Sequence, residues 1–209
     1  MLLSRPFETV TPTVDGQVLA VLAGASEWFP LSRIHALADA WSRSGIRKSL
    51  QRLVEQGIVE RQQLGSQYSY RLNRSHLAAP AVIELAGLYA TYLMRLRSSL
   101  QGWPVEPAFA ALFGSATRGD MRHGSDIDLF LVRPAEADPS DLRTVWDSRV
   151  ADLAAASTSW TGNDTRVLEM SEAEVVGGMA AKDPVLQDIR AYGITLIGSL
   201  ANLDRVHHG

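Results

Sequence analysis

Two aspartates in the C-terminal half of the chain have a spacing that suits metal-assisted chemistry. Asp126 and Asp128 are two positions apart in the run SDIDLFLV, so a β-strand would project both carboxylates from one face. Neighbouring carboxylates repel each other unless a cation lies between them. Carboxylate oxygens are also the ligands that Mg²⁺ prefers. The pair therefore predicts a magnesium site with Asp126 and Asp128 as metal ligands and catalytic residues.

A Gly-Ser pair precedes the aspartates and has the character of a phosphate-binding turn. Gly114 gives the backbone room for close approach to a ligand, and Ser115 adds a hydroxyl. The amides at the start of a following helix carry partial positive charge, which suits a phosphate. Arg118 supplies a full positive charge. A phosphate cradle and a carboxylate pair separated by one helix predict nucleotidyl transfer.

Alternating apolar segments predict the elements that position these residues. Ile127, Leu129 and Leu131 should face a core on the side of the strand opposite the aspartates. The expected elements are a strand over 109–113, a helix from Ala116, a strand over 127–132, a helix from Asp141 to about Ala156, a strand over 165–170, a helix capped by Ser171 and Glu174, a helix opened by Asp183-Pro184 and a closing strand over 194–197.

The motif GSATRG…SDIDL, in which ten residues separate Ser115 from Asp126, resembles the signature of the polymerase-beta nucleotidyltransferase superfamily. It is most similar to the minimal branch that contains antitoxin-type and kanamycin-modifying transferases, over about residues 105–200. The resemblance implies Mg²⁺ on the aspartate pair and a nucleoside triphosphate, which we expect to be ATP. It assigns phosphate contacts to Gly114, Ser115, Ser125 and, less directly, Arg118.

The chain departs from this family at a third carboxylate, which usually comes from the next strand. Alignment places Arg166 at that position. Asp164 has the same strand parity as Arg166 and could substitute, whereas Glu169 would face away unless a bulge intervenes. A guanidinium at 166 could instead neutralise the aspartates or a phosphate, which would give a nucleotide sensor without turnover. The sequence leaves catalysis open.

The N-terminal part carries a second pattern, that of a nucleic-acid-binding domain. Helices are expected from Asp15 to Gly24, after Pro30, and from a Ser44 cap to Gly57. A hairpin over 58–64 and 67–72 follows, with Tyr68, Tyr70 and Leu72 packing back on the helices. The segment SGIRKSLQRLVEQGIVERQQLGSQYSYRLN resembles the recognition helix and wing of MarR- and ArsR-type winged-helix regulators, over about residues 15–75.

That resemblance implies contacts with double-stranded DNA, through the recognition helix in the major groove and the wing on the backbone. The matching recognition-helix residues are Arg43, Ser44, Arg47 and Lys48, with Arg52 one turn further, and the wing residues are Gln62, Gln63 and Gln67. Two alternatives remain open. These residues could be the solvated face of an amphipathic helix, or the winged helix could bind protein.

A long apolar stripe between the two patterns predicts a single helix over 78–104, entered at Pro80 and stopped by Gly102. It could connect the domains, form the interface of a homodimer or pack within its own chain. The predicted organisation is α+β, with a winged-helix domain over 1–77, the connector over 78–104 and a nucleotidyltransferase-like mixed sheet flanked by helices over 105–209.

Composition and charge agree with two domains that bind different partners. Residues 1–80 hold nine Arg or Lys against six Asp or Glu, and the remainder holds eleven against seventeen. The chain has no cysteine, which excludes disulfides, thiolate zinc sites and cysteine nucleophiles. No apolar run approaches a membrane span of roughly 18 residues. The first residues lack the apolar core of a secretion signal. We expect a soluble, cytoplasmic protein.

Three functions are compatible with these patterns. The first is a transcription regulator whose transferase-like domain binds nucleotide and Mg²⁺. The second is an active nucleotidyltransferase that modifies a protein, an RNA end or a small molecule, with the winged helix recruiting the substrate. The third, which has the least support, is an antitoxin-like module whose connector helix binds a partner protein.

Overall fold

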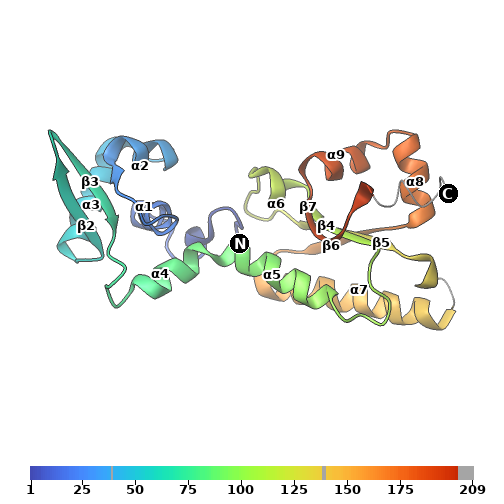
Figure 1. Ribbon diagram of the computed structural model, residues 1–209. Coiled ribbons are helices and arrows are strands. Elements are labelled where there is room, and N and C mark those ends of the chain that lie inside the picture. Colours follow the sequence, from blue (N-terminus) through green and yellow to red (C-terminus); the bar gives the residue numbers. More distant parts are fainter. Residues whose placement is uncertain (39, 138–139, 202–209) are drawn as a thin grey trace. The chain divides into compact units, whose positions relative to one another are not determined.

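The computed structural model describes residues 1–38, 40–137 and 140–201. They divide into two compact units, one of Leu2–Tyr89 and one that comprises Met1 and the described residues from Ala90 onward (Figure 1). Each unit combines helices with its own sheet, so the mixed α+β class expected from the sequence is confirmed. Within the described ranges, no helix combines the length and the apolar character that a membrane crossing requires.

The N-terminal unit is built from helices and a hairpin in the order expected for a winged helix. Its elements are a 3₁₀ turn (Pro6–Thr9), α1 (Val14–Ala23), β1 (Phe29–Pro30), α2 (Leu31–Leu37), α3 (Arg43–Glu55), β2 (Val59–Leu64), β3 (Gln67–Leu72) and α4 (Ala79–Ala86). The strands form an antiparallel sheet in the order β1-β3-β2. Fully buried side chains from α1, α2 and α3, among them Leu22, Ile34 and Leu50, make the core.

The N-caps of α1 and α3 are not the residues expected. Thr13 caps α1 by accepting from the Gly16 amide at 3.5 Å, and Ser42 caps α3 by accepting from the Gly45 amide at 3.2 Å. Asp15, the expected cap of α1, lies inside the helix because its carboxylate instead accepts hydrogen bonds from Ser49 and Arg52 of α3. Tertiary contacts between the two helices therefore override the local capping preference.

The hairpin packs on the helices only near its base. Tyr70 and Leu72 are buried, as expected, whereas Tyr68 is 46% exposed. The reason is its register: Tyr68 pairs with Gln63, close to the Gly65-Ser66 turn. The guanidinium of Arg61 covers its ring at 4.6 Å from the centroid.

The single helix expected over 78–104 is interrupted. It consists of α4 and a second helix, α5 (Leu88–Leu100), which are separated by Gly87. The Gly87 amide donates to the Ile83 carbonyl at 3.0 Å and to the Glu84 carbonyl at 3.1 Å, which closes the last turn of α4. Glycine weakens a helix interior because it has the largest backbone freedom to lose, so this is the physically weakest point of the stripe.

The C-terminal unit contains a mixed sheet in the order β6-β5-β4-β7. Its further elements are β4 (Phe109–Phe113), α6 (Ser115–Arg118), β5 (Ile127–Arg133), a 3₁₀ turn (Ala135–Ala137), α7 (Ser140–Thr161), β6 (Thr165–Ser171), α8 (Glu172–Ala180), α9 (Pro184–Tyr192) and β7 (Ile194–Gly198). The expected strands and the Ser171–Glu174 capping box are confirmed. β5 runs parallel to β6, and β4 is antiparallel to both β5 and β7.

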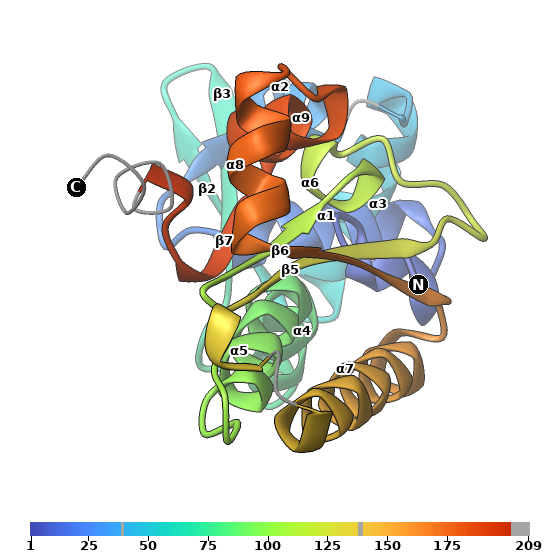
Figure 2. The ribbon, with the colours of Figure 1, turned by 90° about the vertical axis from the view of Figure 1, so that its right-hand side faces the viewer.

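Helices cover both faces of this sheet (Figure 2). The α5 and α7 helices lie on one face, joined by a 2.8 Å hydrogen bond between the Tyr92 and Ser157 hydroxyls. The α8 and α9 helices cover the other face, where Phe130 and Val132 are buried with Leu186. β5 is consequently apolar on both sides from Leu129 to Val132, with Asp128 near its start, Asp126 directly before it and Arg133 at its end.

Candidate functional site

The central feature of the C-terminal unit is the contact between Asp128 on β5 and Gly114 at the end of β4. The two strands are antiparallel, with Phe113 paired to Asp128, so Gly114 lies beside the second aspartate. A Cβ built on Gly114 would come within 2.5 Å of the Asp128 Oδ2 atom. Gly114 also has a φ of 73°, a conformation that residues with a Cβ rarely adopt. The local fold therefore requires glycine at this position for two separate reasons.

The aspartate pair creates a strongly negative environment at the start of β5. Burial raises the pKa of Asp128 above its ordinary value, and the neighbouring Asp126 raises it further. Arg166 and Arg118 act in the opposite direction without cancelling the effect. A carboxylate that loses part of its solvation next to a second carboxylate favours either a proton or a cation. The electrostatic environment of the Asp126–Asp128 pair therefore favours a bound cation.

Arg166 already supplies one positive charge to this pair. Its Nη2 atom lies 2.8 Å from Asp126 Oδ2, and its side chain is 73% exposed. In the parallel β5–β6 register Arg166 is the residue paired with Asp128, which is where the alignment placed it. The guanidinium therefore belongs to the aspartate site and is not an unrelated surface group.

The two candidates for a third acid lie in different places. Asp164 precedes β6 and lines a small cavity of about 210 Å³ together with Ser125, Asp126 and Asn163. The Asp164 carbonyl accepts from the Ile127 amide at 2.8 Å, which ties the start of β6 to the start of β5. Asp164 thus shares a cavity with Asp126.

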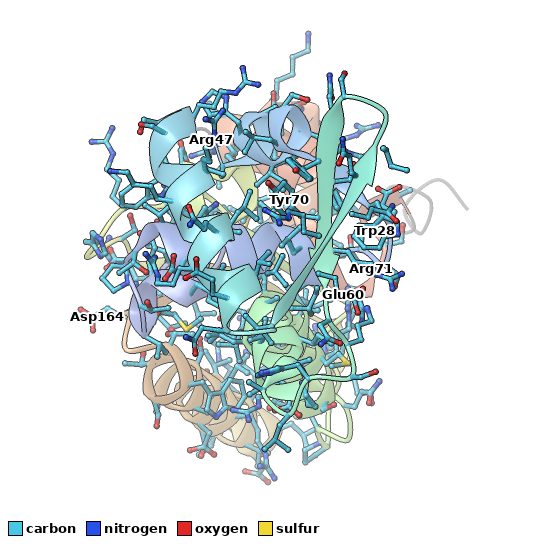
Figure 3. All side chains as sticks on the ribbon, turned by 90° about the vertical axis from the view of Figure 1, so that its left-hand side faces the viewer. Trp28, Arg47, Glu60, Tyr70, Arg71 and Asp164 are labelled. Carbon is cyan, nitrogen blue, oxygen red and sulfur yellow. The ribbon has the colours of Figure 1, made fainter. Side chains whose placement is uncertain are left out.

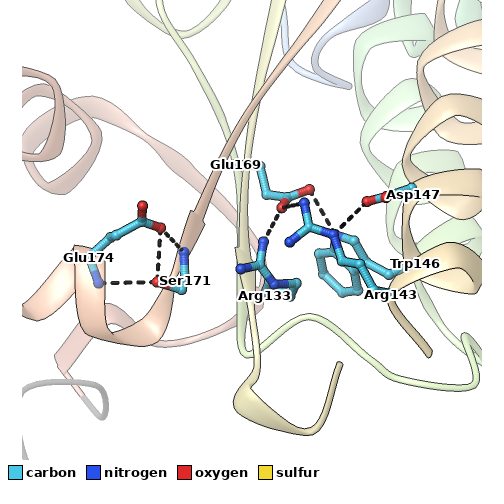
Figure 4. Close-up of polar contacts among 7 residues, drawn as sticks. All are labelled: Arg133, Arg143, Trp146, Asp147, Glu169, Ser171 and Glu174. Carbon is cyan, nitrogen blue, oxygen red and sulfur yellow. Dashed lines mark hydrogen bonds and ion pairs between the residues drawn. The ribbon is translucent and has the colours of Figure 1, made fainter. Parts of the chain in front are cut away.

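Glu169 lies on the opposite face of the sheet, in an ionic cluster with α7 (Figure 4). Its carboxylate accepts from Trp146 Nε1 at 2.8 Å, lies 3.1 Å from Arg143 Nη2 and pairs with Arg133. Because these contacts hold the carboxylate on the α7 side of β6, Glu169 cannot act as an acid beside Asp126 and Asp128.

The residues expected to contact phosphate differ in how they are engaged. Ser115 begins α6 directly after Gly114. The hydroxyl of Ser125 accepts from the Arg122 amide at 2.9 Å and its carbonyl accepts from Asn163 Nδ2 at 2.9 Å, so it orders the loop before β5. The guanidinium of Arg118 donates from Nη1 to both carboxylate oxygens of Asp188, each at 2.9 Å.

The donor set fits magnesium in type, with two carboxylates on one strand face and backbone in close approach at Gly114. In the part of the chain that the structure describes, no group of three Asp, Glu or His side chains is arranged to hold a metal ion. The fit therefore rests on the pair alone, and it requires Asp126 to exchange its contact with Arg166 for one with the metal.

A separate groove in the N-terminal unit carries the nucleic-acid candidates. It has a volume of about 690 Å³ and runs between α3 and the β2–β3 hairpin. Figure 3 shows Arg47 on α3 and Tyr70 on the hairpin. Its polar and aromatic lining includes Arg43, Arg47, Gln51, Arg61, Gln67, Tyr68 and Tyr70. Gln51, Arg61 and Tyr68 are not among the expected DNA contacts, although the spacing of 43, 47 and 51 on one helix face could have identified Gln51.

The expected DNA-binding residues do not all have free side chains. Arg43, Ser44, Arg47 and Lys48 are exposed on the first turns of α3. Arg52 instead forms an ion pair with Asp15, in which Nε donates to Oδ2 at 3.0 Å. Burial alone would raise the pKa of Asp15, but hydrogen bonds from Arg52 and Ser49 outweigh it and lower that pKa. Arg52 therefore joins α3 to α1.

In a comparison with known protein families, one family model matches part of the C-terminal unit. Residues 93–156 match the nucleotidyltransferase domain model, and this segment contains Gly114, Ser115, Asp126 and Asp128. The match coincides with the segment in which the sequence motif indicated a resemblance to nucleotidyltransferases. No curated protein matches the chain.

Several solved structures are similar over parts of the chain. A toxin-antitoxin crystal structure with AMP-PNP is 19% identical and covers 55% of this chain and 77% of its own, with a TM-score of 0.33. A MarR-family transcriptional regulator from Silicibacter pomeroyi is 13% identical, with 74% and 79% coverage and a TM-score of 0.33. Bordetella bronchiseptica BpsR is 15% identical, with 48% and 72% coverage and a TM-score of 0.32. TM-scores this low do not establish a common fold.

Proposed function

We propose that this protein is a DNA-binding transcription regulator whose nucleotidyltransferase-type domain binds a nucleoside triphosphate together with Mg²⁺. The observation that carries the nucleotide half is the contact of Gly114 with Asp128, inside the segment that matches the family model. The Gly114 turn cannot accept a Cβ because the Asp128 carboxylate fills that space, and the helix that begins at Ser115 directly follows it, so a helix N-terminus and a carboxylate pair lie side by side where phosphates and a cation would meet.

In this proposal Asp126 and Asp128 hold the metal, and Gly114 and Ser115 contact the phosphates. Magnesium neutralises phosphate charge and orients the chain of phosphates. Ser125 and Asn163 keep the loop before β5 in place through their 2.9 Å hydrogen bond. Arg118 is available to a phosphate only if it exchanges Asp188 for the ligand, so its contribution is secondary. ATP is the nucleotide to test first.

The DNA half of the proposal rests on the groove between α3 and the hairpin. Arg43, Arg47 and Arg61 outweigh the one acidic residue of its lining, Glu55, and the Arg61 guanidinium lies over the ring of Tyr68. Arginine pairs with guanine edges or with phosphates, so the exposed turns of α3 suit a major groove and the hairpin suits the adjacent backbone. Ser44 and Lys48 lie on the same exposed turns of the helix.

Both halves can be tested on the purified full chain. DNA binding would be measured by fluorescence anisotropy on genomic fragments that the protein selects. Arg47→Met is the test variant, and Arg149→Met, which removes an exposed arginine of α7, is its control. Nucleotide binding would be measured by the thermal stabilisation that Mg²⁺ and AMP-PNP produce, with Asp126→Asn/Asp128→Asn as the comparison. If Arg47→Met and Arg149→Met bind DNA equally well, the DNA half of the proposal is wrong. If Mg²⁺ and AMP-PNP stabilise the aspartate variant as much as the unaltered protein, the nucleotide half is wrong.

A second candidate function, an active nucleotidyltransferase, is favoured by one observation. Asp164 shares the 210 Å³ cavity with Asp126 and offers the carboxylate that Arg166 does not. Incubation with labelled triphosphates and cell extract tests this function. Transfer that requires Asp126, Asp128 and Asp164 supports it, and equal labelling by the Asp164→Asn variant removes Asp164 from the reaction.

A further inference from the structure

Arg166 and a divalent cation would compete for the same oxygen. Arg166 Nη2 lies 2.8 Å from Asp126 Oδ2, and the register pairs Arg166 with Asp128. A metal ion bound by both carboxylates would need the side of Asp126 Oδ2 that Arg166 now occupies. Arg118, the arginine of the sequence motif, donates both of its 2.9 Å hydrogen bonds to Asp188 and does not replace Arg166 at Asp126.

We infer that Arg166 acts as a resident counter-cation that makes this site selective for a metal–triphosphate chelate over the free metal ion. The inference rests on the proposed nucleotide function. A free divalent ion gains Asp126 only by expelling Arg166 and then lies close to its positive charge. A metal that carries phosphates brings its own anion, so the displaced guanidinium exchanges a carboxylate for phosphate oxygens.

The exposure of the pair allows this exchange. The Arg166 side chain is 73% exposed and Asp126 is 26% exposed, so water and the flexible arginine stem allow the guanidinium to leave without exposing a buried charge. Ion pairs of this kind are weak. Repulsion between a guanidinium and a divalent ion about 5 Å apart in water weakens metal binding on the order of tenfold.

This arrangement predicts that metal and nucleotide bind cooperatively, and that Arg166 adds to the coupling that direct coordination of the metal by the phosphates supplies. Thermodynamic linkage requires the two effects to be equal: the factor by which AMP-PNP tightens Mn²⁺ binding is the factor by which Mn²⁺ tightens AMP-PNP binding. Arg166 is thus a specificity-determining residue, and its removal should separate free-metal binding from chelate binding.

The test measures Mn²⁺ binding by electron paramagnetic resonance of the unbound ion, first alone and then with AMP-PNP, with protein-free Mn²⁺ and AMP-PNP as the reference for chelation in solution. We expect Arg166→Met to bind free Mn²⁺ on the order of tenfold more tightly than the unaltered protein, and to show an enhancement by AMP-PNP that is smaller by the same factor. Arg149→Met, with the same loss of charge on an exposed arginine of α7, should behave like the unaltered protein. Arg166→Lys, which keeps the charge, should retain part of the coupling.

The outcomes separate this inference from the function on which it rests. If the unaltered protein and Arg166→Met bind free Mn²⁺ equally, and Asp126→Asn/Asp128→Asn abolishes that binding, the metal site stands and the role of Arg166 is wrong. If none of these proteins binds Mn²⁺ with or without AMP-PNP, the proposed function fails and the inference falls with it. Binding of free Mn²⁺ by Arg166→Met alone, together with binding of the Mn²⁺–AMP-PNP chelate by the unaltered protein, would support both.

Discussion

The carboxylate of Asp128 lies against the backbone of Gly114, so close that a Cβ on Gly114 would stand 2.5 Å from Oδ2. This contact links the end of β4 to the start of β5 and unites the two halves of the sequence motif. At Gly114 the lack of a side chain therefore matters in two ways: it permits the positive φ, and it leaves the space that the Asp128 carboxylate fills.

Replacing Gly114 by alanine should cost more than its backbone conformation explains. Gly102 has a similar φ of 75° but open space where a Cβ would stand, so Gly102→Ala measures the conformational effect alone. We expect about 1 kcal/mol of lost stability for Gly102→Ala and about 1–3 kcal/mol more for Gly114→Ala, which must also displace Asp128. Urea unfolding gives both values. Equal losses would show that the Asp128 contact is readily relieved.

The raised pKa of Asp128 predicts how stability changes with pH. Burial and then Asp126 raise that pKa above 3.8, so the folded protein binds the proton more tightly than the unfolded chain. The stabilising contribution is therefore present below pH 3.8 and lost as pH rises through the folded-state pKa. At neutral pH, Asp128→Asn should be more stable than the unaltered protein.

The measurement is urea unfolding of both proteins between pH 3.5 and pH 7, as the difference between them at each pH. That difference should shrink toward acid pH, because the unaltered side chain is then neutral too. Mg²⁺ with AMP-PNP at neutral pH should favour the unaltered protein. A difference that does not change with pH would show that Asp128 has the same pKa in the folded and unfolded states.

Arg47 and Arg52 should separate DNA binding from stability. Arg52 pairs with Asp15 of α1, at 55% exposure, so Arg52→Met should lower the stability of the N-terminal unit slightly and leave DNA affinity nearly unchanged. Arg47→Met should leave stability unchanged and weaken DNA binding. Where Arg47 contacts a phosphate, the slope of log affinity against log salt should fall by about 0.9. The reverse pattern would reassign the two arginines.

Local patterns were sufficient where a few consecutive residues determine the structure. The period-two runs of β5 and β6, the capping box at Ser171 and the alignment of Arg166 with the site all follow from short segments. The break at Gly87 was also visible in the sequence as a glycine inside a helical stripe, but the apolar stripe on both sides of it favoured one helix.

Contacts between distant segments could not be read from the sequence. Arg118 pairs with Asp188, seventy residues further along, and Arg52 pairs with Asp15 of another helix. Both arginines have the side chain expected of a phosphate contact, and sequence alone does not reveal an internal carboxylate partner. The cap Thr13 was missed for a related reason, because the Asp15 carboxylate accepts hydrogen bonds from α3 instead of capping its own helix.

Glu169 and Asp164 provide the last prediction, which tests the third carboxylate. Glu169 is 20% exposed and neutralises Arg133, at 13% exposure, while accepting from Trp146 Nε1. Glu169→Ala would remove this acceptor from Arg133, Trp146 and Arg143, so we expect a loss of about 1–3 kcal/mol with nucleotide binding kept wherever the domain remains folded.

Asp164→Asn should behave in the opposite way, with stability nearly unchanged because Asp164 is exposed and its structural hydrogen bond uses the carbonyl. If the domain transfers nucleotides, Asp164→Asn should lower the rate, whereas Glu169→Gln, a milder change than alanine, should retain it. Urea unfolding and labelled-nucleotide transfer on the same preparations separate the two roles. Loss of transfer in Glu169→Gln with intact folding would mean that Glu169 reaches the aspartate face of the sheet.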